Sequence, residues 1–246
     1  MTDGITVGAY KLDAVRIEAT LARLRLRIVA RFPAASLGNV CAALVATARE
    51  TAISAAQLRR PMWWLRGLAL LVATAWAIGT IYVVREIDWA GLRQKADVTS
   101  LAQGLDSSVN LLLLAGAAIW FVLTAEERIK RSGTLAKLHA LRSFAHVIDM
   151  HQLTKDPTMI LAGATNTSAS PERHMSEFEL ARYLDFCAEM LALTAKLAAL
   201  YAGASSDRTI LQAATEIEDL SSDLGRKIWQ KIMILSQLNE GRVAKA

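Results

Sequence analysis

Two long stretches without a charged residue constrain the fold more than any other feature of the chain. The first runs from Gly67 to Val84 and the second from Ser107 to Ala125. A helix rises about 1.5 Å per residue, so roughly 20 apolar residues cross the hydrocarbon core of a bilayer. A buried core helix is the alternative, but charges usually interrupt such helices sooner. We therefore expect two transmembrane helices.

The rest of the composition fits an all-α membrane protein. Hydrophobic residues make up 53% of the chain, above a typical soluble domain, and there are only four prolines. We find no strand pattern. We predict an N-terminal cytoplasmic amphipathic helical hairpin (1–60), a first transmembrane helix (61–84), an extracytoplasmic loop (85–108), a second transmembrane helix (109–125) and a C-terminal three-helix cytoplasmic bundle (126–246).

Basic residues flank the two spans on the side that both chain termini share. Lys and Arg concentrate on the cytoplasmic side of short flanks, whereas the loop 85–108 carries more acidic than basic side chains. We therefore predict a multi-pass protein of the inner (plasma) membrane with both termini in the cytoplasm. The flanking residues are Arg59, Arg60 and Arg66 before or at the start of the first span, and Arg128, Lys130 and Arg131 after the second.

The N-terminal segment has a cationic helical face. Residues 9–32 read as an amphipathic helix that ends at Pro33, and Ser36 can cap a second helix running to about Arg60. Four arginines of the first helix fall within an arc of about 80°. This face is either solvated or in contact with anionic lipid headgroups. The candidate headgroup contacts are Arg16, Arg23, Arg27 and Arg31.

The C-terminal segment has the pattern of a helical bundle. Ser176 and Glu179 form a Ser-x-x-Glu capping box at the start of a helix that ends near Gly203. The last helix carries a coiled-coil-like apolar seam that steps by 7, 7, 4 and 7 residues. Its members are Ile210, Ile217, Leu224, Ile228 and Leu235.

The stretch LRSFAHVIDMHQLTKDP, residues 141–157, concentrates ionisable side chains at one helix end. Three of them, together with a histidine just before the stretch, fall within about 80° of one another on a helix, and a glutamate on the next helix could face them. The stripe has three interpretations: a solvated face, a structural polar seam, or a ligand or metal site. The candidate residues are His139, Arg142, His146, Asp149 and Glu189.

Motifs of common chemistry are missing from the sequence. We find no phosphate loop, no nucleophile elbow and no zinc-type Cys/His spacing, so we assign neither a cofactor nor a metal with assurance. The net charge of +5 comes mainly from residues 1–60, which favours a lipid surface over nucleic acid as the partner. Cys41 and Cys187 lie on predicted cytoplasmic helices and should be free thiols.

These patterns predict a function in interaction rather than catalysis. We expect a membrane-anchored helical scaffold or sensor that self-assembles and acts through protein–protein contacts, with an anionic bilayer, a second copy and a cytoplasmic protein as partners. Small residues in the spans, such as Gly79 and Gly116, favour close helix pairing. One alternative is an oligomeric ion channel or membrane-disrupting effector. Another is a metal-dependent enzyme seated on His146, Asp149 and Glu189.

Overall fold

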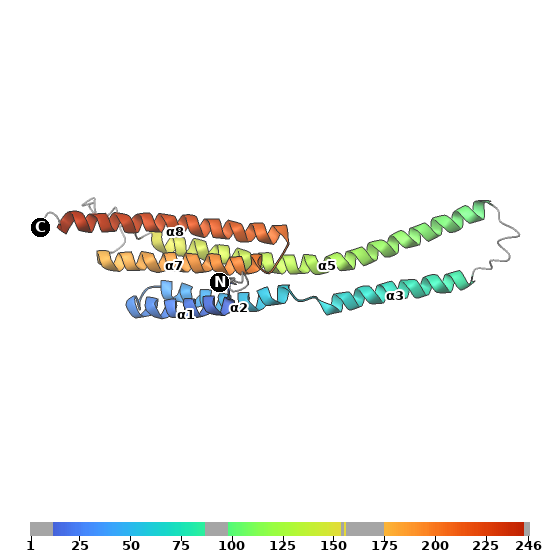
Figure 1. Ribbon diagram of the computed structural model, residues 1–246, viewed down its shortest axis with the longest axis horizontal. Coiled ribbons are helices and arrows are strands. Elements are labelled where there is room, and N and C mark those ends of the chain that lie inside the picture. The colour runs from blue at the N-terminus through green and yellow to red at the C-terminus, as the bar shows by residue number, and fades with distance from the viewer. Residues whose placement is uncertain (1–11, 87–97, 154, 156–174, 244–246) are drawn as a thin grey trace, which may run out of the picture. The chain divides into compact units, whose positions relative to one another are not determined.

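The computed structural model describes residues 12–86, 98–153, 155 and 175–243, and these residues are helical apart from short turns and caps (Figure 1). No strand occurs in these ranges, so the predicted all-α class is confirmed for them. The chain divides into two compact units, Met1–Arg59 with Gly133–Ala246, and Arg60–Ser132. We refer to them as the bundle unit and the hairpin unit. The helices are α1 (Ala14–Arg31), α2 (Leu37–Leu58), α3 (Trp63–Glu86), α5 (Val98–Leu153), α7 (Glu177–Ala202) and α8 (Arg208–Val243).

The first two helices form the predicted αα-hairpin. Asp13 caps α1 because its carboxylate accepts a hydrogen bond from the Val15 backbone N–H at 2.9 Å. Pro33 lies just beyond the end of α1. Gly38 lets α2 approach α1 closely, since a Cβ at this position would lie 3.1 Å from a methyl group of Val29. The predicted apolar face of α1 is buried, with Ile17, Leu21, Leu24 and Ile28 all at most 5% exposed.

The central helix of the bundle unit is α7, which packs against α1, α2 and α8. It begins with the predicted capping box: Ser176 Oγ accepts from the Glu179 N–H at 3.3 Å, and the Glu179 carboxylate accepts from the Ser176 N–H at 2.8 Å. It ends at Gly203, as predicted. Contact with three neighbouring helices explains why its buried face is broad, about half of the helix circumference; the buried residues include Leu184, Cys187, Met190, Leu191, Leu197 and Tyr201.

The last helix buries the seam expected from its sequence. Asp207 Oδ1 accepts from the Thr209 N–H at 2.8 Å and caps the start of α8. All five seam residues, from Ile210 to Leu235, are at most 5% exposed. The part of α5 after Gly133 adds further side chains to the same core, namely Leu138, Leu141, Ala145 and Ile148.

The N-terminal hairpin and the C-terminal helices share one core, although the sequence analysis treated them as separate segments. The reason is that α7 packs against α1 and α2 as well as against α8, and its broad buried face is shared among them. Polar contacts reinforce the junction. The Arg59 guanidinium donates to the Gly203 carbonyl at 2.7 Å, and Lys137 Nζ donates to Ser54 Oγ.

The hairpin unit contains α3 and the N-terminal part of α5. Both helices are long and apolar enough to cross a membrane, judged by length and composition. The helix α5 begins at Val98, within the segment 85–108 that we predict to be the extracytoplasmic loop. Residues 98–108 contain no proline and extend the helix toward the N-terminus. Residues 87–97 lie outside the described residues.

Candidate functional site

The polar stripe predicted on α5 faces water for most of its length. His139 and His146 are exposed. Arg142 Nη1 lies 3.5 Å from Glu216 Oε2, and both side chains are half exposed. Exposed ion pairs contribute about 0–1 kcal/mol to stability, because water screens them. The structure therefore supports the solvated-face interpretation for these residues.

The C-terminal end of the stripe is part of a buried polar seam. Gln152 is 2% exposed, and its Nε2 donates to Asp149 Oδ1 at 2.5 Å. Its Oε1 accepts a hydrogen bond from Lys231 Nζ of α8 at 2.6 Å. Lys231 also donates to the Gln152 carbonyl at 3.3 Å. These bonds satisfy polar groups inside the bundle and fix the position of α8 along α5.

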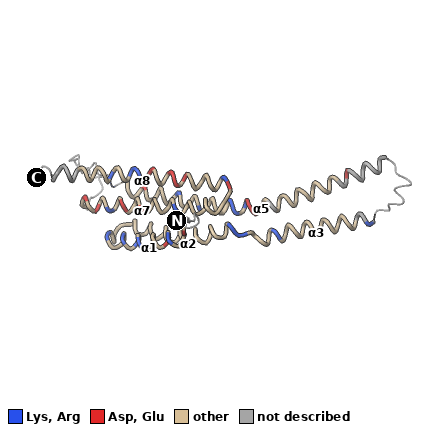
Figure 2. The backbone as a smooth tube through the Cα atoms, in the orientation of Figure 1, with Lys and Arg blue, Asp and Glu red and all other residues tan. Residues whose placement is uncertain are grey.

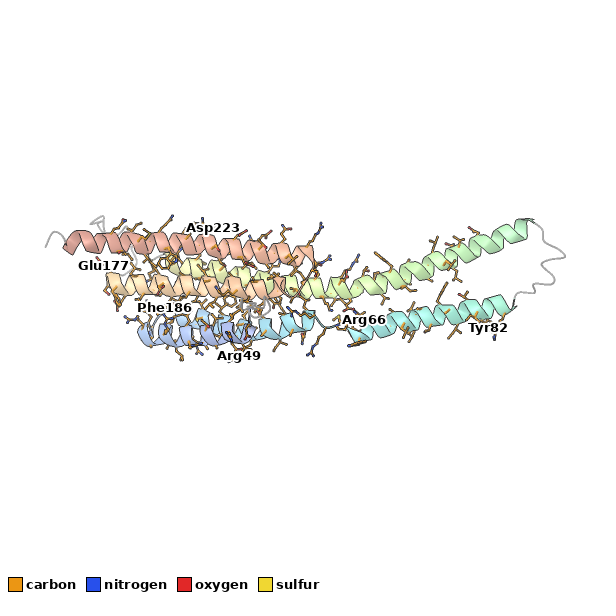
Figure 3. All side chains as sticks on the ribbon, in the orientation of Figure 1. Arg49, Arg66, Tyr82, Glu177, Phe186 and Asp223 are labelled. Atoms are coloured by element: carbon orange, nitrogen blue, oxygen red, sulfur yellow. The ribbon has the colours of Figure 1, made fainter. Side chains whose placement is uncertain are left out.

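Glu189 is not assembled with the histidines of α5; it pairs with α1. Its two carboxylate oxygens accept from Arg27 Nη1 and Nη2 at 2.9 and 3.0 Å, a bidentate arrangement. The Arg27 guanidinium also lies 5.2 Å from the centre of the Phe186 ring, which α7 turns toward α1 (Figure 3). In the described part of the chain, no group of three or more His, Cys, Asp or Glu side chains is placed to hold a metal ion.

Basic residues recur along α1 (Figure 2), and their side chains are divided between contacts with the protein and exposure to solvent. Arg27 is held by Glu189, and the Arg31 guanidinium lies 5.3 Å from the centre of the Phe178 ring. Arg16 is strongly exposed and pairs with Asp13 at 3.6 Å. The exposed Arg23 donates to a backbone carbonyl of its own helix. Arg16 and Arg23 therefore remain accessible to an anionic surface, whereas Arg27 has a partner within the bundle.

A cleft of about 740 Å³ opens at one end of the bundle unit. The turn between α1 and α2, the C-terminal end of α5 and the N-terminal end of α7 line it together. Its side chains combine an apolar wall with basic and hydroxyl groups. They include Arg31, Phe32, Met150, His151, Lys155 and Tyr183.

Tyr183 organises the polar side of the cleft. Its hydroxyl lies 3.4 Å from His151 Nδ1, and Lys155 Nζ lies 5.6 Å from the centre of its ring. Burial raises the pKa of the Tyr183 hydroxyl well above its ordinary value, so this group stays neutral at physiological pH. Phe32 packs edge-on against the same ring, with ring centres 5.5 Å apart. The aromatic pair therefore forms a rigid wall beside two basic side chains.

The cleft takes residues from the stretch that the sequence analysis singled out, but they are not the candidate residues predicted there. His151 lies on a different side of α5 from His139 and His146, so the prediction from helical phase did not include it in the stripe. Lys155 follows the end of α5 and has no helical phase. One feature of the sequence could have pointed to His151 and Lys155. Both lie at the end of one predicted bundle helix, where the start of the next bundle helix could approach them. Tyr183 carried no such signal, because its spacing also fits a core residue.

A second polar cluster lies in the hairpin unit at the start of α3. Glu126 accepts hydrogen bonds from the Met62 N–H at 3.0 Å and from Lys130 Nζ at 2.7 Å. Arg66 approaches it at 3.6 Å, and Lys130 also donates to the Arg60 carbonyl. These bonds, from the Lys130 side chain first and then the Met62 backbone, hold the pKa of Glu126 below its ordinary value. The cluster joins α3 to α5 in the region where the predicted spans meet their basic flank.

The two cysteines are free thiols, as predicted, and both are buried. Burial raises the pKa of Cys41 to about 11 and that of Cys187 to about 12. A thiol with such a pKa forms almost no thiolate at neutral pH, so both residues serve as packing groups in the folded state.

Comparisons with known proteins add no assignment to this geometry. No protein-family model matches the chain, and no curated protein or solved structure matches it significantly.

Proposed function

We propose that this protein is a membrane-anchored helical scaffold or sensor. In this proposal α3 and the N-terminal part of α5 insert as a hairpin into the inner membrane, and the bundle unit is presented in the cytoplasm. The observation that carries it is the exposure of large apolar side chains along both helices. Examples are Leu70, Ile78, Leu113 and Trp120, which are 66–71% exposed. Such a surface is unfavourable in water and favourable in lipid.

The basic flank supports the proposed orientation. Arg59, Arg60 and Arg66 precede or open α3, and Lys130 and Arg131 follow the apolar part of α5. Both groups belong on the cytoplasmic side by the positive-inside rule.

Single-cysteine labelling in intact cells tests this topology. The native thiols are buried with raised pKa values, so we expect little labelling of Cys41 and Cys187 themselves. We expect a membrane-impermeant maleimide to label Gly91→Cys in the predicted outer loop in intact cells. It should label Ser222→Cys, on the exposed side of α8, only after permeabilisation. The reverse pattern, or a chain that stays soluble without detergent, contradicts the proposal.

Self-assembly is the second part of the proposal. A side chain added at Gly79 or Gly116 would meet no atom within 4 Å among the described residues, so neither glycine supports a close helix contact there. Glycines of this kind in apolar helices favour close pairing with another helix. We expect Gly79→Leu and Gly116→Leu to lower the oligomeric state in nanodiscs, measured by mass photometry, with Gly225→Leu on α8 as the control. An unchanged oligomer, or a monomeric parent protein, excludes pairing through these positions.

A further inference from the structure

We infer that the cleft at the end of the bundle unit binds a small anionic amphiphile, a molecule with one carboxylate and a compact hydrocarbon body. The inference gives the sensor part of the proposed function a ligand class. Binding itself does not require membrane insertion, because every residue that lines the cleft belongs to the bundle unit.

The size of the cleft favours a small molecule. Its volume of about 740 Å³ falls within the range of about 300–1,000 Å³ that is typical of ligand pockets. The apolar wall, formed by Phe32, Met150 and Met175 among others, matches a hydrocarbon body. Methionine side chains adapt to ligands of irregular shape because they are unbranched and flexible.

The charge of the cleft favours an anion. Arg31, His151 and Lys155 line it, and among the lining residues that the structure describes Glu179 is the only carboxylate. Glu179 is engaged in the capping box, since Ser176 donates to its carboxylate from both N–H and Oγ at 2.8 and 2.9 Å, and it leaves the three basic side chains in excess over one acid. These bonds hold the pKa of Glu179 below its ordinary value. The N-terminal end of α7 adds a further positive potential.

Within the bundle unit, the cleft lies far along α5 from the point where the chain passes to the hairpin unit. The chain passes to the hairpin unit at Arg59 and Gly133. The cleft lies at the other end of α5, where His151 is 18 residues beyond Gly133. At about 1.5 Å per residue this separation is about 27 Å along the helix. A ligand that reaches the cleft therefore approaches the end of the bundle unit away from that connection.

Calorimetric titration of the full-length protein in nanodiscs tests the inference, with empty nanodiscs as the blank. The probe is 4-phenylbutyrate, and 4-phenylbutan-1-ol is the neutral comparison of similar size. We expect saturable binding of 4-phenylbutyrate at one site per chain and roughly tenfold weaker binding of the alcohol. No saturable binding, or equal binding of the two probes, overturns the inference.

Variants then locate the site. Lys155→Gln and Arg31→Gln should each weaken 4-phenylbutyrate binding by about tenfold. Ala34→Trp should abolish it by filling the cleft from the exposed turn between α1 and α2, without disturbing the core. Lys196→Gln, at an exposed position on α7, should bind like the parent. Unchanged binding in Ala34→Trp places the probe elsewhere and rejects the cleft. The topology labelling is independent, so either proposal can fail alone.

Discussion

The helices α7 and α3 have similar lengths and are both rich in apolar residues, yet they use these residues in opposite ways. Most large apolar side chains of α7 are buried, because three other helices contact it. Along α3, Leu70, Leu71, Ile78 and Tyr82 are 62–67% exposed. The comparison teaches that apolar content alone does not decide whether a helix forms a protein core. The packing of neighbouring helices decides that, and among the described residues α3 lacks the surrounding helices that cover α7.

The largest expected effect separates the two regions directly. Leu184→Ala on α7 removes fully buried methyl groups and should lower the free energy of unfolding of the bundle unit by about 2–5 kcal/mol. Leu113→Ala on α5 removes a side chain that is 66% exposed, and it should change that free energy by less than about 0.5 kcal/mol. Denaturant unfolding in nanodiscs, followed by circular dichroism, measures both. Equal effects would remove the distinction between the two regions.

The polar cluster of the hairpin unit provides the next test. Glu126→Ala should cost about 2 kcal/mol of local stability, because it removes the acceptor of the Met62 N–H and one of the acceptors of the Lys130 ammonium. Hydrogen exchange at Met62 measures this opening. Glu126→Gln retains one acceptor oxygen and should show a smaller effect.

The same carboxylate gives a pH dependence with a defined sign. Its pKa is lower in the folded protein than the ordinary value of 4.5, so its stabilising contribution is complete above about that pH. The contribution is lost as the pH falls through the lowered folded-state pKa. Protection of the Met62 amide should therefore decline in acid for the parent protein, whereas Glu126→Ala should lack this component. A parent profile that is flat below pH 4.5 argues against the cluster.

Within the bundle unit, the capping box of α7 should contribute less than a core leucine. Ser176→Ala removes the side-chain acceptor for the Glu179 N–H and should cost about 1 kcal/mol. Ser222→Ala on the exposed side of α8 is the matched control and should be close to neutral. Thermal unfolding measures the midpoint temperature of both variants. Equal midpoints for Ser176→Ala and Ser222→Ala would contradict a stabilising role of the capping box.

The smallest expected effect concerns the pair between Arg27 and Glu189. The two side chains are 47% and 32% exposed, so their coupling should be about 0.5–1 kcal/mol despite the bidentate geometry. A double-mutant cycle with alanine at both positions measures it, and Arg23→Ala serves as the solvent-exposed comparison. The same comparison can be made for lipid binding. Arg23→Glu should weaken binding to anionic vesicles more than Arg27→Glu, since Arg27 is engaged within the bundle.

Local patterns predicted much of the helical architecture. The capping box at Ser176, the break at Pro33 and the seam of α8 all depend on residues within one helix, and the structure confirms each. The shared core could not be predicted in the same way. It depends on the match between α1–α2 and a face of α7 that is distant in sequence, and helical periodicity contains no information about such a match.

The candidate site shows the same limit at the level of single residues. Helical phase placed His139, Arg142 and His146 on one face correctly, but it could not show that the face is open to water. Nor could it show that Glu189 pairs with Arg27. Long-range pairing depends on the relative rotation of helices, which is set by how their side chains pack.

The amino-acid sequence by itself determined the helices and the two apolar stretches, because hydrogen-bond periodicity and the transfer of apolar groups from water act over a few residues at a time. Only the tertiary structure decided that Arg31, His151, Lys155 and Tyr183 meet around one cleft. These residues come from three helices and a turn. They converge because the ends of those elements are brought together by burying a core that none of them could form alone.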